Sequence, residues 1–179
     1  MKKVIGNKIF LKILSPDDVG EKYLTWMQDK EVTKFLESRW DEYSVKKLKE
    51  YVKKTNDSSD NFLFGIFLKE NNTHIGNIKI GNINHFHGYG DLGFLIGKDH
   101  WNKGYGTESI KLATNYAFNQ LKLHKLFAGI YSNNIGSYKA FLKAGFNEVG
   151  RLKKHHQYQG TFVDQIIVEK LNNEKEAEK

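Results

Sequence analysis

The stretch Trp101-Asn102-Lys103-Gly104-Tyr105-Gly106-Thr107-Glu108 lies between an apolar segment and a long amphipathic one. The preceding run, residues 91–97, reads Asp-Leu-Gly-Phe-Leu-Ile-Gly and predicts a short buried strand that ends in turn residues. After the stretch, apolar residues recur at helical spacing, with polar residues between them: Ile110, Ala113, Ala117 and Leu121. The predicted order is therefore strand, glycine loop, helix.

The glycine loop predicts a binding site for a phosphate. Gly104 and Gly106 allow a sharp turn and leave backbone N–H groups uncovered, and the first helical turn adds unpaired donors and the positive end of its dipole. A nucleotide P-loop is excluded because Thr107 and Glu108 stand where lysine and a hydroxyl residue are required. A dinucleotide fingerprint is excluded because Ser109 replaces its third glycine.

The surviving pattern, Lys103-Gly104-x-Gly106-Thr107, resembles the coenzyme A loop of the GNAT N-acetyltransferases, Gln/Arg-x-x-Gly-x-Gly/Ala. Trp101 takes the Gln/Arg position, and this departure is similar to the loops of the RimJ/RimL-like branch. A glycine pair alone also fits a plain turn. A second motif is needed to decide between the two interpretations.

Residues 131–146 resemble the other signature of this family, Asn-x-x-Ser/Ala followed by a helix that ends Lys-x-Gly-Phe. Asn134 suits a helix N-cap, and Gly145 can take the left-handed conformation that ends a helix. A capped helix that leads into a strand is the alternative for this motif alone. Both motifs occur in the family's order, with a predicted strand at 125–131 between them, and the resemblance extends from about residue 8 to residue 171.

The resemblance implies a mixed α/β chain with the GNAT-type acyl-CoA N-acyltransferase fold: a splayed, mostly antiparallel central sheet flanked by helices. The strands at 91 and 125 would run parallel, joined by a right-handed crossover. A bulge around Leu95 and Ile96 would splay the sheet and admit the coenzyme's arm. Residues 1–171 are expected to form one domain, and the charged residues 172–179 a disordered tail.

Composition restricts the chemistry. The 179 residues contain no cysteine, which excludes thiolate metal sites and an acyl-cysteine intermediate, so acetyl would pass directly to its acceptor. His85 and His87 have no obvious third ligand nearby, so no metal is expected. No apolar run reaches membrane-spanning length, and a cytoplasmic protein with no membrane partner is expected.

The net charge of +7 raises a nucleic-acid alternative. The basic residues are nearly all lysine, with Arg39 and Arg151 the two arginines, whereas arginine is preferred for bidentate phosphate contacts. Lysines between 46 and 54 fit the solvated face of a helix, so nucleic acid is not the expected partner. A non-catalytic RNA-binding or acyl-CoA-sensing domain remains the alternative function, and a homodimer is left open.

The resemblance assigns coenzyme-binding residues to three segments. Backbone N–H groups of the glycine loop would bind the pyrophosphate, with Lys103 as a nearby charge, and Lys139 and Lys143 are further candidates for phosphate contacts. Leu95 and Ile96 would supply N–H groups to the oxyanion of the tetrahedral intermediate. The candidate coenzyme set is Leu95, Ile96, Asn102, Lys103, Gly104, Tyr105, Gly106, Thr107, Asn134, Ser137, Lys139 and Lys143.

Catalysis also requires a neutral amine and a proton for the leaving thiolate. Asp91 stands three residues before Phe94, where family members have a glutamate that takes the amine's proton through water; an exposed acid at a strand start is the alternative. Phe141 replaces the tyrosine that protonates the thiolate in many members. The expected catalytic set is therefore Asp91, Asn134, Ser137 and Tyr138, with Ser137 assisting and Tyr138 mainly in the core.

The acceptor is expected to be a primary amine, on either a nucleotide-linked amino sugar or a protein N-terminus. Residues 26–36 are similar to a Trp-x-x-Asp-x-Glu-Val stretch of this branch, including members that act on such sugars. A loop predicted at 155–160 would lie near the acceptor. Four aromatic residues fit either acceptor contact or the core, and the core is the more frequent role: Trp26, Phe35, Trp40 and Tyr43.

Overall fold

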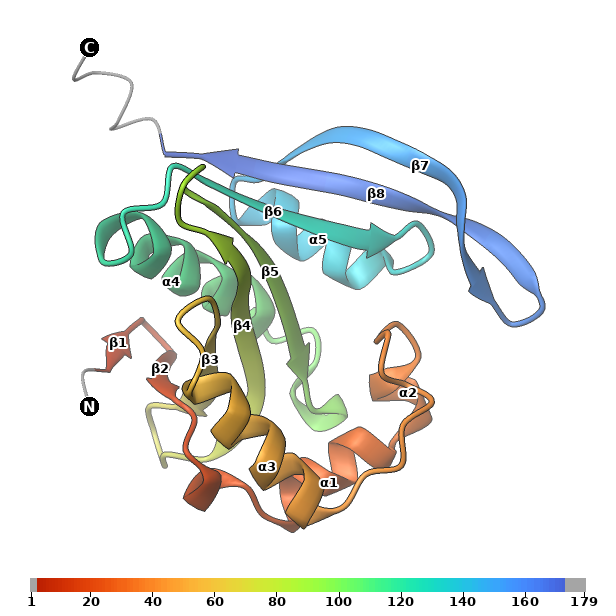
Figure 1. The fold of residues 1–179 in the computed structure, drawn as a ribbon. Coiled ribbons are helices and arrows are strands. Elements are labelled where there is room, and N and C mark those ends of the chain that lie inside the picture. Colours follow the sequence, from red (N-terminus) through yellow and green to blue (C-terminus); the bar gives the residue numbers. More distant parts are fainter. Residues whose placement is uncertain (1–2, 173–179) are drawn as a thin grey trace.

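The computed structural model describes residues 3–172, and within them eight strands form one sheet in the order β1-β2-β3-β4-β5-β6-β8-β7 (Figure 1). Every neighbouring pair is antiparallel except β5 and β6. The predicted tail at 172–179 falls almost wholly outside the described residues, and a single domain over 1–171 stays a prediction. The strands are β1 (Val4–Ile5), β2 (Ile9–Ile13), β3 (Phe62–Leu68), β4 (His74–Asn84), β5 (Tyr89–Ile96), β6 (Lys125–Tyr131), β7 (Asn147–Tyr158) and β8 (Thr161–Leu171).

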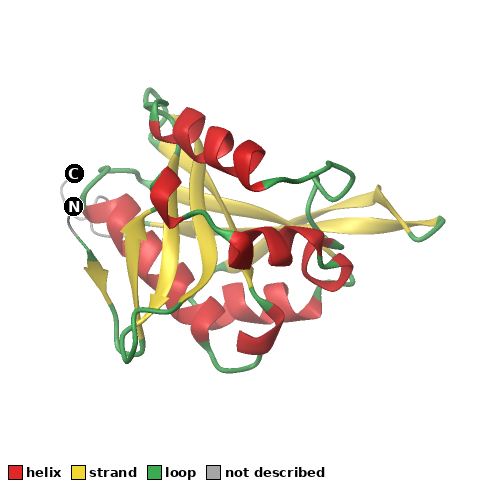
Figure 2. Ribbon diagram, turned by 90° about the horizontal axis from the view of Figure 1, so that it is seen from below, coloured by secondary structure: helices red, strands yellow, loops and turns green. Residues whose placement is uncertain are grey.

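Helices cover both faces of the sheet (Figures 1 and 2). Apolar residues of α4 and α5 join the larger core cluster, and those of α1 and α3 join a second cluster on the other face. The predicted apolar face of α4 is confirmed, because Ile110, Ala113 and Ala117 are fully buried. The helices are α1 (Glu21–Gln28), α2 (Lys30–Thr33), α3 (Val45–Asn56), α4 (Tyr105–Asn119) and α5 (Ile135–Lys143), with 3-10 turns at Pro16–Asp18 and Lys98–His100.

The sheet is splayed, as predicted, because β5 and β6 separate. The two strands pair in parallel over three residues only, and the last pair joins Asp91 to Phe127. The predicted bulge at Leu95 and Ile96 is wrong: β5 keeps an unbroken register with β4 from Asp91 to Ile96, and the irregularity lies between Gly81 and Asn84. The sheet therefore opens where a strand pair ends, and no inserted residue is involved.

The long β7–β8 hairpin extends away from the body of the molecule (Figure 2). The loop predicted at 155–160 is shorter than expected, because His156, Gln157 and Tyr158 still pair with β8. A bulge between Leu152 and His156 absorbs the irregular sequence, so that the turn contains only two residues. Among residues 3–172, no helix has the length and apolar character of a membrane span.

Candidate active site

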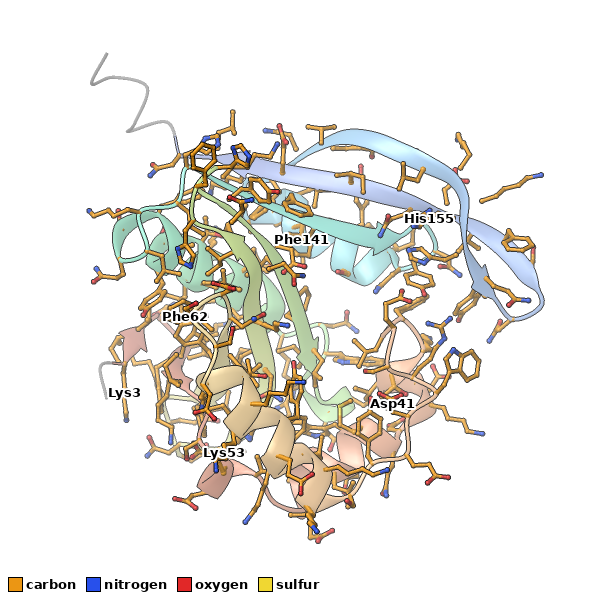
Figure 3. All side chains as sticks on the ribbon, viewed as in Figure 1. Lys3, Asp41, Lys53, Phe62, Phe141 and His155 are labelled. Atoms are coloured by element: carbon orange, nitrogen blue, oxygen red, sulfur yellow. The ribbon has the colours of Figure 1, made fainter. Side chains whose placement is uncertain are left out.

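The divergence of β5 from β6 opens a cleft of about 1470 Å³. Its walls are β5, the N-terminal ends of α4 and α5, β6, and the segment from α2 to α3. In Figure 3, Phe141 marks the α5 side of this region and Asp41 marks the segment that leads to α3. The two sequence motifs, which are about 30 residues apart in the chain, thus lie on one cavity.

The glycine loop has the conformation that the sequence predicts. Gly104 is the N-cap of α4 and takes a left-handed φ of 85°, and Asn102 has a φ of 59°. Residues 104–107 line the cleft, so the uncovered N–H groups at the start of a 15-residue helix face it. A Cβ at Gly106 would lie 3.0 Å from the ring of Phe94 on β5, so a side chain there would require the ring to move by a few tenths of an ångström. Gly104 is favoured by its left-handed φ, and Gly106 by the close approach of α4 to Phe94.

Three side chains hold this loop in place. The indole Nε1 of Trp101 donates to the carbonyl of Ile96 at 2.6 Å, which fastens the loop to the end of β5. Glu108 Oε1 accepts hydrogen bonds from the backbone N–H groups of Lys8 at 2.9 Å and Ile9 at 3.4 Å, which fastens the helix to the start of β2. Lys103 Nζ donates to the Asp99 carbonyl at 2.8 Å, within the loop itself. The anchoring by Glu108 was missed in the sequence, because its partner lies 100 residues away.

The second motif forms the capped helix that the sequence predicts. The side chain of Asn134 accepts from the N–H of Ser137 at 3.2 Å, and Gly145 follows the helix with a φ of 89°. Ser137, Lys139 and Lys143 line the cleft. These residues join the glycine loop around one end of the cavity, which we call the coenzyme end.

Tyr138 points away from the cleft. Its hydroxyl donates to Glu148 Oε2 on β7 at 2.7 Å, and this bond to a carboxylate raises the pKa of Tyr138. Its ring packs against the larger core. Phe141 is only 2% exposed and packs between Phe94 and Phe146, with ring centroids at 5.8 and 5.0 Å. Of the candidates for thiolate protonation, Ser137 alone therefore has a hydroxyl on the cleft.

Asp91 lies on β5 at the point where β5 and β6 separate. It lines the cleft on the face that α1 and α3 cover, and its Oδ2 accepts a hydrogen bond from Asn82 Nδ2 at 2.7 Å. The hydroxyl of Tyr51 on α3 interacts with this carboxylate. The pKa of Tyr51 is raised chiefly by burial and also by the negative charge of Asp91. The half-buried carboxylate thus faces the cavity and has one oriented partner.

Beyond Asp91, no strand among residues 3–172 pairs with the edge of β5 that faces the cleft. The N–H of Gly97 donates to the carbonyl of Ile75, on the β4 side, at 2.9 Å. In an antiparallel pair the backbone groups of successive residues face alternate sides, so the N–H of Leu95 also faces β4. The N–H groups of Phe94 and Ile96 point the other way, to the open edge. Of the two residues predicted at the oxyanion, Ile96 presents its N–H to the cleft and Leu95 does not.

A cluster around Tyr131, at the end of β6, also lines the cleft; Phe35 and the segment 155–160 were predicted near the acceptor, but Tyr131, Glu37 and Arg39 were not. The hydroxyl of Tyr131 donates to Glu37 Oε1 at 2.8 Å and accepts from Arg39 Nη1 at 2.9 Å. The Tyr131 ring stacks on the imidazole of His156, with 3.8 Å between ring centroids. Burial raises the pKa of Tyr131 and lowers the pKa of His156. Phe35 stacks on Tyr158 at 5.3 Å. We call this region the acceptor end.

The four aromatic candidates have different positions. Trp26 is 7% exposed and belongs to the second core cluster. Phe35 and Tyr43 line the cleft, and the Tyr43 hydroxyl donates to the Ser38 carbonyl at 2.6 Å. Trp40 is 80% exposed, and the guanidinium of Arg39 lies 4.8 Å from its ring.

Carboxylates gather beside the acceptor end, in contrast to the positive charge of the whole chain. Three lysines also reach this part of the cleft: Lys34 pairs with Glu31 at 2.9 Å, Lys47 donates to the Glu42 carbonyl, and Lys79 lies on β4. We name the acidic group the carboxylate rim: Glu31, Glu37, Asp41 and Glu42. Among the described residues, no group of three potential ligands could hold a metal ion, and His85 pairs with Asp60 at 3.1 Å.

Comparison with known proteins agrees with this geometry. The family model described as "Acetyltransferase (GNAT) domain" matches residues 8–147. The chain is 28% identical over 180 residues to the probable N-acetyltransferase YjcK of Bacillus subtilis, covering 96% of this chain and 98% of YjcK.

Solved structures show the same fold. A spermidine N-acetyltransferase from Vibrio cholerae, in complex with CoA and spermine, superposes with a TM-score of 0.83 at 20% identity, over 94% of this chain and 98% of that chain. A GNAT-family acetyltransferase from Bacillus anthracis superposes with a TM-score of 0.81 at 20% identity, over 95% and 98% of the two chains. Because the family model spans most of the sequence, the chain belongs to the acetyltransferase (GNAT) domain family and is an acetyl-CoA-dependent N-acetyltransferase.

Proposed function

We propose that this enzyme transfers acetyl from acetyl-CoA directly to a primary amine that enters the cleft from the acceptor end. The observation that carries the proposal is that the start of α4 and the carboxylate of Asp91 face one cavity. The acceptor amine belongs to a nucleotide-linked amino sugar or a protein N-terminus. From Trp101 in the glycine loop, we further propose that the chain belongs to the RimJ/RimL-like branch and acts in the cytoplasm.

The coenzyme end supplies the binding groups. N–H groups from Asn102 to Thr107 hold the pyrophosphate, and the side chains of Lys139 and Lys143 add positive charge from α5. Lys103 contributes less, because its ammonium group is bonded to the Asp99 carbonyl. Asn134 acts through the helix cap, which places the N–H and hydroxyl of Ser137 at the cavity.

The chemistry follows from the groups on the cleft. Asp91 takes a proton from the ammonium group of the acceptor through a water molecule, and the neutral amine attacks the thioester carbonyl. The N–H of Ile96 stabilises the oxyanion that forms. The intermediate then expels the thiolate while its nitrogen loses a proton, and the hydroxyl of Ser137 or a water molecule relays a proton from the nitrogen to the sulfur. The products are the acetylated amine and CoA.

Ser137→Ala is expected to lower kcat about tenfold, because it deletes the one candidate hydroxyl on the cleft. Tyr138→Phe, its matched control, removes a hydroxyl bonded to Glu148 outside the cleft and should leave kcat within about twofold of the native value. Steady-state kinetics with a free-thiol assay measures both. Full turnover of Ser137→Ala together with a loss in Tyr138→Phe would reverse the assignment.

The proposed reaction is tested by thermal shift with acetyl-CoA, followed by thiol release with a panel of an amino sugar nucleotide, N-terminal peptides and polyamines. Binding of the coenzyme without thiol release from any amine would refute turnover. That result would instead support an acyl-CoA-sensing domain, the alternative suggested by Phe141 in place of a proton-donating tyrosine. Stabilisation by RNA in place of acetyl-CoA would favour the RNA-binding alternative.

A polyamine is a second candidate acceptor, favoured by the carboxylate rim and by the spermine bound in the Vibrio cholerae structure. Glu37→Gln is then expected to raise the KM for spermidine about two- to fivefold and to leave the KM for acetyl-CoA unchanged, since Glu37 is exposed and screened. Glu50→Gln, on α3 outside the cleft, is the matched control. Equal effects of both variants, or no effect of Glu37→Gln, would remove this candidate.

A further inference from the structure

A lysine and the proposed base are neighbours on the sheet that lines the cleft. In the pairing of β4 with β5, Lys79 lies opposite Gly93, and two residues farther along Gly81 lies opposite Asp91. Lys79 also pairs with Leu63 of the second core cluster, so these positions share the face that α1 and α3 cover (Figure 1). Lys79 and Asp91 are therefore diagonal neighbours, with Cα atoms about 7–8 Å apart. Both line the cleft.

The two glycines beside this pair leave different spaces. A Cβ at Gly81 would lie 2.6 Å from Lys79 Cε and 2.8 Å from Asp91 Oδ1, so both side chains lean over Gly81. A Cβ at Gly93 would meet no atom of the described residues within 4 Å, its chain neighbours aside. Gly93 also lines the cleft. The space above Gly93 is therefore open, with a carboxylate along the same strand and the lysine on the strand opposite.

The ammonium group of Lys79 is available to a ligand. Lys79 is half-buried, and among the described residues it has no hydrogen bond and no ion pair. The other two lysines in this part of the cleft have partners, since Lys34 pairs with Glu31 and Lys47 donates to the Glu42 carbonyl. A partly buried ammonium group attracts an anion more strongly than one in open water, because less water screens it.

We propose that Lys79 is a specificity-determining residue: its ammonium group binds an anionic oxygen, of a carboxylate or a phosphate, that the acceptor carries near its amine. The proposal rests on the proposed function and selects among its acceptors. The amine lies in the space above Gly93, within reach of Asp91, and the anion lies beside Lys79, so each charge of the acceptor meets its opposite. The backbone of a protein N-terminus offers only neutral oxygens, and a polyamine brings a second ammonium group that Lys79 repels.

Lys79→Met tests the proposal, because it removes the charge and keeps the length of the side chain. Thiol release is measured with a nucleotide-linked amino sugar, the same sugar without phosphate, a free amino acid and spermidine. The KM for the anionic acceptor should rise about tenfold or more, because a hydrogen bond to a charged group is lost. The KM for the phosphate-free sugar and for spermidine should not rise. Which of the two anionic acceptors is affected identifies phosphate or carboxylate as the anion.

Two further variants separate this role from a structural one. Lys79→Arg keeps the charge and should restore most of the lost affinity for the anionic acceptor. Lys49→Met, on α3 outside the cleft, should leave every KM near native. An equal rise in KM for all four acceptors in Lys79→Met would assign Lys79 to Asp91 or to the fold and overturn the inference. Native turnover of spermidine alone would also overturn it and leave acetyl transfer to amines standing.

Gly93→Ala tests the space itself. A methyl group there has nothing to displace in the free protein, so the melting temperature and the affinity for acetyl-CoA should stay native. The KM for the acceptor should rise about tenfold, because the methyl group fills the place of the amine. Gly150→Ala, on β7 with open space and outside the cleft, is the matched control. A native KM in Gly93→Ala would refute this position for the amine. A native protein that releases no thiol with any amine would instead overturn the proposed function.

Discussion

Gly104→Val is expected to lower the affinity for acetyl-CoA at least tenfold in a protein that still folds. The glycine has a φ of 85°, a conformation that costs a residue with a Cβ about 1–2 kcal/mol and a β-branched residue more. The chain can relieve this strain by rotating the N-cap, which turns the N–H groups at the start of α4 away from the cleft. Calorimetric titration with acetyl-CoA measures the loss.

Gly20→Val provides a matched control, because Gly20 is also a helix N-cap glycine but has an extended φ of −141° and open space around it. It should bind acetyl-CoA with native affinity. A second pair of variants tests the neighbouring contact: Gly106→Ala pushes against Phe94, and the added change Phe94→Leu should restore part of the affinity. Native affinity in both Gly104→Val and Gly106→Ala would refute the backbone phosphate site.

Asp91→Asn is expected to lower kcat/KM about a hundredfold while the affinity for acetyl-CoA is unchanged. The amide cannot take a proton from the acceptor, and general base catalysis is typically worth a factor of 10² to 10⁴. The geometry should survive, because an amide oxygen still accepts the hydrogen bond from Asn82. The deficit should shrink toward alkaline pH, where more of the acceptor amine is already neutral in solution.

The control for this variant is Asp60→Asn, which removes an exposed carboxylate paired with His85 outside the cleft. It should leave kcat/KM near native at every pH. A pH profile of kcat/KM for the native enzyme and both variants distinguishes the roles. If Asp91→Asn loses activity equally at all pH values, or also loses coenzyme affinity, Asp91 has a structural role and another group is the base.

Local chemistry made much of this fold predictable from the sequence. The starts of α4 and α5 follow from Gly104 and Asn134, because a left-handed glycine and an N-cap side chain act on neighbouring backbone groups. The buried face of α4 follows from its periodicity. The parallel pairing of β5 with β6 follows once a strand, a helix and a second strand are recognised in order.

Residues 26–36 and 155–160 were expected near the acceptor, but the contacts between them and β6 could not be predicted, because they join residues that are far apart in the chain. Tyr131 and Glu37 are separated by 94 positions, and Arg39 reaches Gln157 across 118. No local pattern marks such pairs. The bulge expected at Leu95 failed for a related reason: where β6 leaves β5 depends on the packing of distant elements.

The contacts between the segment before α3 and the tip of the β7–β8 hairpin have a consequence for the evolution of substrate choice. Phe35 rests on Tyr158, and Arg39 donates to the carbonyl of Gln157 and to the hydroxyl of Tyr131, so a segment before α3 packs against the tip of the β7–β8 hairpin and the end of β6. The glycine loop contributes nothing to these contacts. Changes in the two segments can therefore retune which amine is accepted, while the donor half of the enzyme is inherited intact.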